Sequence, residues 1–155
     1  MKDDDVEPWR WFLKAHAAAL AAIEADMAAR SVIPLSWYDV LLELNSAEGR
    51  QLRMTDLAER VVLSRTRVSR VVDELVAEGL VERTKNPADG RSALATLTKE
   101  GRAALRAAAP HYLAGIRTHF LELLEPGERE VIATALRRVA LHHKEAASGP
   151  RRARR

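Results

Sequence analysis

Apolar side chains recur every three or four residues over long stretches at both ends of this 155-residue chain. Such spacing aligns one face of a helix and predicts long helices over residues 9–30, 99–124 and 128–144. Pro110 predicts a bend in the second of these helices, and the sequence Glu-Pro-Gly at 125–127 separates it from the third. The composition agrees, because 27 alanines and 20 leucines favour helix, while valine and isoleucine together number only 16.

Three shorter helices are predicted between the long ones. Each follows a residue whose side chain can cap a helix: Ser36, Thr55 and Ser64. The last two helices, over residues 56–61 and 65–78, are separated by so few residues that they predict a helix-turn-helix. Gly79 is expected to end the second of them.

The apolar period changes after Gly79. Residues 80–85 and 92–97 are short runs with strand character, and the sequence Asn-Pro-Ala-Asp-Gly at 86–90 is a dense turn signal between them. Together they predict a β-hairpin, after which Thr98 is expected to cap the next long helix. The predicted fold class is therefore mainly α with a small β-hairpin.

The formal net charge is +3, but the charged residues are distributed unevenly along the chain. Residues 1–48 carry 4 bases and 9 acids, residues 49–103 carry 11 and 8, and residues 104–155 carry 10 and 5. Four of the last five residues are arginines, so much of the high isoelectric point comes from residues 148–155, which we expect to be a disordered tail. The middle segment is therefore the more informative basic region.

Several classes of protein are disfavoured by what the sequence lacks. There is no cysteine, which excludes disulfides, thiolate zinc sites and iron–sulfur clusters. No stretch approaches the ~18 apolar residues of a membrane span, and the N-terminus is acidic where a signal peptide is basic, so a cytoplasmic protein is expected. A Gly-rich phosphate loop, a nucleophile elbow and a His–carboxylate motif are also missing, so an enzyme is not expected.

The helix predicted over residues 65–78 carries its charges against its dipole. Arg65 and Arg67 fall in the first turn, where a cation costs roughly 0.3–1 kcal/mol, while Asp73 and Glu74 fall in the C-terminal half. An anionic partner would offset that cost, and arginine suits phosphates and guanine edges in the DNA major groove. The side expected to be buried is an apolar stripe: Val68, Val71, Val72 and Leu75. The side chains then available to DNA are Ser64, Arg65, Thr66, Arg67, Ser69 and Arg70.

The predicted hairpin adds a second basic feature. Lys85 and Arg91 flank its turn, and slender cationic tips suit the minor groove. Taken singly, the helix fits a solvated amphipathic helix and the hairpin fits an ordinary exposed turn. Taken together, they predict a winged helix-turn-helix that binds double-stranded DNA.

Five ordered motifs resemble the multiple-antibiotic-resistance regulator (MarR) family. They are LAER at 57–60, LSRTRVSRVVDEL at 63–75, GLVER at 79–83, NPADGR at 86–91 and LTKEG at 97–101. The resemblance implies a transcriptional regulator that dimerises through its terminal helices and binds pseudo-palindromic DNA, with Arg91 in the minor groove. Gly90 stands at the first basic position of the family's Asp-Arg-Arg wing motif.

The expected organisation is one MarR-like domain over residues 1–147. Residues 34–98 would form the winged helix-turn-helix lobe that binds DNA, flanked by dimerisation helices in residues 1–33 and 99–147. The alanine-rich apolar faces of these helices allow close packing against a second copy. The expected function is that of a homodimeric repressor that a small molecule releases from its operator.

A small aromatic or anionic effector is a further expectation from the resemblance, since similar regulators bind such ligands between the dimerisation helices and the lobe. Candidate ligand-binding residues are Trp11, His16, Trp37 and Tyr38, which equally suit a core or an interface. Four histidines on the terminal helices lack the spacing of a close ligand set, so no metal and no cofactor is expected. The alternatives are a winged-helix module that binds an acidic protein, or a nonspecific DNA-binding module without an effector.

Overall fold

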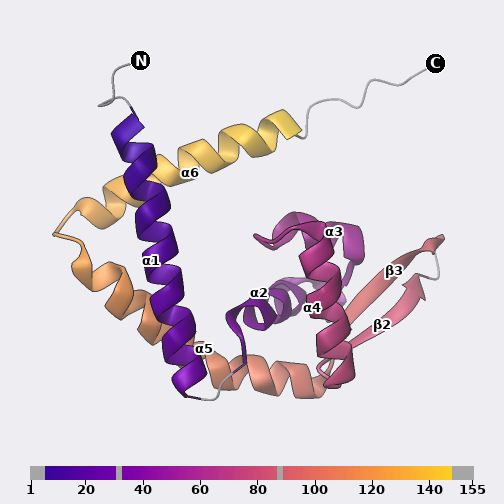
Figure 1. Ribbon diagram of the computed structural model, residues 1–155. Helices are drawn as coiled ribbons and strands as arrows, with labels where there is room; N and C mark the ends of the chain where they lie inside the picture. The colour runs from indigo at the N-terminus through magenta and orange to yellow at the C-terminus, as the bar shows by residue number, and fades with distance from the viewer. Residues whose placement is uncertain (1–5, 31–32, 87–88, 148–155) are drawn as a thin grey trace, which may run out of the picture.

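Figure 1 shows the computed structural model of the chain, which describes residues 6–30, 33–86 and 89–147. Two long helices, α1 (Glu7–Ala29) and α5 (Lys99–His119), lie side by side. The last helix, α6 (Glu128–Ala147), leaves the C-terminal end of α5 at an angle, while a small lobe lies at the N-terminal end of α5. The mainly α fold class is confirmed.

The lobe combines short helices with a small antiparallel sheet. Its helices are α2 (Leu35–Ser46), the 3-10 turn η2 (Glu48–Arg50), α3 (Met54–Arg60) and α4 (Arg65–Ala77). Its strands are β1 (Gln51–Arg53), β2 (Val81–Asn86) and β3 (Asp89–Leu97), in the order β1-β3-β2. Strands β2 and β3 extend beyond the helices as a wing, as the hairpin prediction required (Figure 1).

Strand β1 is a strand that the sequence did not indicate. It has three residues, and all of them pair with β3, from Gln51 opposite Thr96 to Arg53 opposite Leu94. Its sequence, one leucine between two polar residues, is too short to show the alternation of apolar and polar residues by which a strand is recognised. The hairpin is therefore part of a three-stranded sheet, with β3 in the middle.

Two of the four predicted helix caps are confirmed and two are wrong. The hydroxyls of Ser64 and Thr98 accept hydrogen bonds from backbone N–H groups at the starts of α4 and α5. Ser36 is instead the second residue of α2, because the extended Pro34 precedes that helix and its carbonyl already accepts two backbone N–H groups. Thr55 is the second residue of α3, because β1 passes directly into that helix.

The predicted helix over residues 99–124 is shorter in the structure. Helix α5 ends at His119, because Phe120 has φ −140° and ψ −60°, and the 3-10 turn η3 (Leu121–Leu123) follows. Pro110 lies inside α5. The chain therefore turns toward α6 earlier than the apolar periodicity suggested.

The hydrophobic core is concentrated in the lobe. Its fully buried side chains come from α2, α3, α4 and β3: Val40, Leu41, Leu44, Leu57, Val68, Val72, Leu75 and Ala95. Helix α1 adds only Ile23 and Met27 to this core, at the end nearest the lobe. Several apolar side chains of α1 and α6 are exposed, among them Trp9, Trp11, Val131 and Val139. Within the described residues, no helix is long and apolar enough to cross a membrane.

The start of α5 approaches the lobe very closely at Gly101. A Cβ atom added there would lie 2.1 Å from the Leu80 carbonyl oxygen and 2.8 Å from a methyl of Leu97. The hydroxyl of Thr98 also donates to the Gly79 carbonyl, 2.9 Å away. These contacts fix the direction in which α5 leaves the wing.

Gly101→Ala is therefore expected to destabilise the protein. Alanine normally stabilises a helix relative to glycine, but here the added methyl must push backbone away, which typically costs about 1–3 kcal/mol. Urea unfolding followed by circular dichroism measures the change, with Glu100→Ala at the adjacent exposed position as the control. An unchanged unfolding midpoint for Gly101→Ala would contradict the close approach.

Candidate nucleic-acid interface

Helix α4 presents a buried apolar stripe and a polar outer face. The four predicted stripe residues are all buried: Val68, Val71, Val72 and Leu75. The hydroxyl of Ser64 accepts a hydrogen bond from the Arg67 backbone N–H at 3.3 Å, which starts the helix in a fixed orientation. On the outer face Arg65, Thr66, Arg67 and Arg70 are exposed, and Ser69 is half-buried. The sequence therefore predicted correctly which side of this helix faces outward.

A polar cleft of about 470 Å³ opens on this outer face. Its lining combines hydroxyls, two guanidinium groups and one carboxylate: Ser36, Ser64, Thr66, Arg67, Arg70, Val71 and Glu74. Among the described residues, no acidic side chain lies within ion-pair distance of Arg67 or Arg70. Arg65 lies outside the cleft, 4.0 Å from Glu59, and both of these side chains are well exposed. Two cations without ion-pair partners, flanked by hydroxyls, form a surface suited to phosphate oxygens.

The acids in the second half of α4 make contacts with other elements. Asp73 accepts a hydrogen bond from Arg83 of β2 at 2.6 Å, which joins α4 to the wing. Glu74 accepts a hydrogen bond from the indole N–H of Trp37 in α2 at 2.9 Å. The charge arrangement that opposes the helix dipole is thus partly explained within the lobe, because each of these acids has a partner outside α4.

The wing carries the two remaining predicted contacts. Lys85 is exposed near the end of β2, where the pairing with β3 becomes irregular. The backbone of Arg91 lies in β3, and its side chain is not among those that the structure describes. Strands β2 and β3 project on the side of the lobe beside α4 (Figure 1). The side chain of Arg83 is held by Asp73, so Lys85 is the basic residue of β2 that has no ion-pair partner among the described residues.

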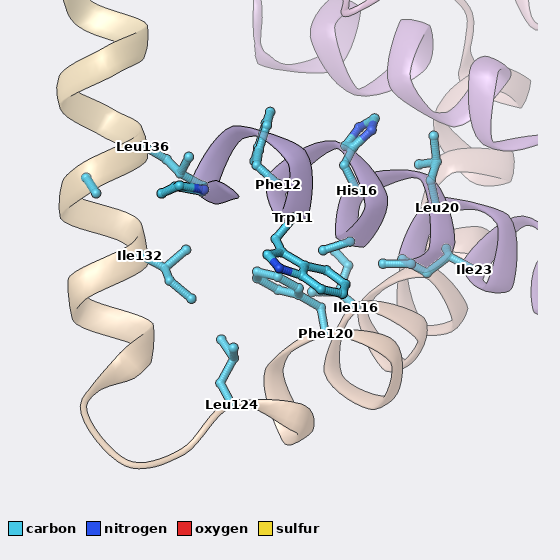
Figure 2. A pocket seen from close by; sticks show the side chains of 14 residues that line it. Trp11, Phe12, His16, Leu20, Ile23, Ile116, Phe120, Leu124, Ile132 and Leu136 are labelled. Carbon is cyan, nitrogen blue, oxygen red and sulfur yellow. The ribbon is translucent and has the colours of Figure 1, made fainter. Parts of the chain in front are cut away.

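A second cavity, of about 600 Å³, lies between the terminal helices α1, α5 and α6. Its wall is almost entirely apolar, and Figure 2 shows the side chains that line it: Trp11, Phe12, His16, Leu20, Ile23, Ile116, Phe120, Leu124, Ile132 and Leu136. Trp11 and His16, two of the predicted ligand-binding residues, both line this cavity. His16 adds a polar ring to an otherwise apolar wall.

The other two predicted ligand-binding residues lie elsewhere. Trp37 reaches α4, and Tyr38 is buried against Tyr112 of α5 with ring centroids 4.6 Å apart. Burial raises the pKa of both phenols, and the neighbouring Asp39 adds to this effect. The pKa of Asp39 itself is raised, first by burial and then by Glu43 and Glu24. Tyr38 is thus part of the contact between the lobe and α5.

The histidines on the terminal helices do not gather into one site. His119 lies 2.9 Å from the Asp26 carboxylate and joins the end of α5 to α1. His142 and His143 are edge-to-face neighbours on α6. Across the described parts of the chain, no three His, Asp or Glu side chains cluster in a way that could hold a metal ion.

Two polar residues that line the cleft, Ser36 and Glu74, were not predicted as site residues. Ser36 was read as a helix cap and Glu74 only as part of an acidic half-helix, because nothing local in the sequence brings α2 beside α4. For Glu74 a signal did exist, since it lies four residues after Arg70 and hence on the same face of the helix.

Known proteins with similar sequences and structures are transcriptional regulators. Residues 33–92 match the MarR family model. An uncharacterized HTH-type transcriptional regulator of Bacillus cereus is 30% identical over 105 residues, which are 68% of each chain. AbsC, a MarR family transcriptional regulator from Streptomyces coelicolor, superposes with a TM-score of 0.80 at 30% identity, over 94% of this chain and 97% of AbsC.

A solved complex with DNA is also similar. Sco3205, another MarR family transcriptional regulator from Streptomyces coelicolor, was crystallised with DNA and superposes with a TM-score of 0.80. The two chains are 28% identical, and the match covers 90% of this chain and 88% of Sco3205. Sequence motifs, fold and relatives agree, and the chain belongs to the MarR family of DNA-binding transcriptional regulators.

Proposed function

We propose that the protein is a repressor that binds a pseudo-palindromic operator as a homodimer. The observation that carries this proposal is the pair of cations, Arg67 and Arg70, beside hydroxyls on the outer face of a rigidly capped helix. Ser64, Arg65, Thr66, Ser69 and the two arginines would contact bases or phosphates in the major groove. In a symmetric dimer the two copies of α4 would meet successive major grooves about 34 Å apart.

The wing would extend the contact into the neighbouring minor groove. Lys85 is exposed near the end of β2, and Arg91 comes shortly after β2 in the sequence. A narrow minor groove concentrates negative potential, which favours cationic side chains there. Because Arg83 is held by Asp73, the wing and α4 would approach DNA as one unit.

The dimer proposal is supported by the apolar surface of the terminal helices. Trp9 is 62% exposed, Val131 68% and Val139 57%, and the apolar cavity lies between these helices. Exposed apolar patches of this kind on a single chain usually mark an interaction surface. A second copy would cover both the cavity and the exposed side chains, with residues 1–33 and 99–147 as the dimerisation region and residues 34–98 as the DNA-binding lobe.

Arg67→Ala tests the DNA-binding surface. If Arg67 reads a base, the substitution weakens binding to the selected operator by about 1–3 kcal/mol. Operators are first selected from random DNA, and affinity is then measured by fluorescence anisotropy at one fixed salt concentration. Arg106→Ala on α5 is the matched control, because it removes an exposed arginine far along the chain from α4.

Two results would count against the proposed operator binding. Unchanged affinity for Arg67→Ala would remove this residue from the interface. If the selection yields no palindrome and the wild-type protein binds all sequences equally, the nonspecific DNA-binding alternative is favoured. If the wild-type protein binds no DNA but binds an acidic protein, the protein-interaction module is favoured. A footprint with two protected half-sites is the expected result.

Val139→Glu tests the dimer surface. A carboxylate placed in an apolar interface without a partner costs several kcal/mol, so the variant is expected to dissociate to monomers. Light scattering coupled to size-exclusion chromatography measures the mass. Val62→Glu is the matched control, because Val62 is 91% exposed but lies in the lobe. Equal dimer masses for both variants would exclude α6 from the interface.

The effector proposal rests on the apolar cavity. A small aromatic or anionic molecule would bind between Trp11 and His16, and the second copy would close the cavity around it. A thermal-shift screen with phenolic acids is expected to raise the unfolding temperature of the wild type and lower its affinity for the operator. Trp11→Ala should remove both effects, and Trp37→Ala should preserve the thermal shift, because Trp37 does not line this cavity. No thermal response to any phenolic acid would favour a constitutive regulator.

A further inference from the structure

We infer that Trp37 is a positioning residue for DNA binding: its indole holds the Glu74 carboxylate away from Arg70 and so keeps the Arg70 guanidinium free for phosphate. Arg70 and Glu74 both line the polar cleft, and the indole N–H of Trp37 in α2 donates to the Glu74 carboxylate. The inference rests on the proposed DNA contact of Arg70. To that contact the inference adds Trp37, a residue that does not itself touch DNA.

The spacing of Arg70 and Glu74 makes them natural partners. Residues four apart on a helix lie one turn above each other, close enough for opposite charges to pair. No such pair forms, because the Glu74 carboxylate oxygen Oε2 lies 2.9 Å from Trp37 Nε1. Within the described residues Arg70 has no other ion-pair partner either.

The indole has an advantage over Arg70 in the competition for Glu74. Trp37 packs against the hydrophobic core and is half-buried, so its N–H is held in one direction. An exposed Arg–Glu pair must instead immobilise two long side chains in water, which leaves little net gain. The indole contact is also charge-assisted, and less side-chain freedom is lost when it forms.

The consequence concerns the charge that the cleft presents. If Glu74 were released, it would neutralise Arg70 and place a carboxylate among groups that face phosphates. Asp73 is held in the same manner by Arg83, so both acids in the middle of α4 are directed to neighbouring elements and away from the cations. Trp37 therefore acts on DNA affinity only through Glu74.

A double-mutant cycle tests this dependence. Operator affinity is measured for the full-length dimer carrying Trp37→Phe, Glu74→Gln, both, or neither, over a series of salt concentrations. Phenylalanine keeps the aromatic packing but removes the N–H donor. Trp37→Phe is expected to weaken binding by about 3- to 10-fold and to lower the salt slope by about 1 for each neutralised Arg70. In the Glu74→Gln background the same substitution should have no effect on either quantity.

The alternative outcomes separate this inference from the proposed contact. If Trp37→Phe weakens binding equally in both backgrounds, Trp37 acts through packing alone and the inference is overturned. If Arg70→Ala leaves operator affinity unchanged, the proposed contact of Arg70 fails, and the inference fails with it. If Arg70→Ala weakens binding but Trp37→Phe does not, only the inference fails.

A second measurement covers the case in which Trp37→Phe does not fold. The chain has three tryptophans, so indole 15N labelling gives three N–H signals in a two-dimensional NMR spectrum. Glu74→Gln is expected to shift one of them, assigned by elimination with Trp9→Phe and Trp11→Phe, while Glu78→Gln leaves all three in place. No shift of the Trp37 signal in Glu74→Gln would show that the hydrogen bond is absent in solution.

Discussion

Burial of the apolar stripe of α4 against α2 and the sheet is the contact on which the rest of the molecule depends. Val68, Val72 and Leu75 are completely covered there, together with Leu41 and Leu44 of α2. This contact fixes the rotation of α4 about its axis, and the rotation decides which side chains face outward. If the apolar stripe were shifted by one position along the sequence, α4 would pack in a different rotation. The arginines would then face the core or lie along the surface.

The same contact brings α2 within reach of the polar side of α4. Once the two helices are packed, a tryptophan at the edge of α2 can donate to a carboxylate on α4, and a serine at the start of α2 joins the cleft. The apolar interior and the charged exterior are thus not independent. The packing supplies the fixed donors that let a helix hold three arginines and two acids without their pairing with one another.

Much of this architecture could be predicted because it depends on local sequence. The stripe of α4, the caps Ser64 and Thr98 and the pairing of β2 with β3 each depend on residues a few positions apart. The rest depends on contacts across long distances in the chain. Strand β1 is a strand only because β3 lies beside it, and Thr55 lost its predicted role as a cap because β1 runs straight into α3.

The candidate ligand residues illustrate the same limit. Trp37 and Tyr38 are adjacent, and adjacent residues on a helix point about 100° apart. One therefore contacts α4 and the other contacts α5, and neither joins Trp11 and His16 in the apolar cavity. Their aromatic character could be read from the sequence, but their directions required the positions of three separate helices.

The length of α5 also has a mechanical consequence. Its 21 residues run from Lys99, two positions before the tight contact at Gly101, to His119, where it is joined to α1. A helix of this length measures about 30 Å along its axis. A tilt of about 10° where α5 meets α1 and α6 would carry the lobe through roughly 5 Å, about one helical pitch. Small rearrangements far from the lobe are thereby amplified into displacements comparable to the features of a DNA groove.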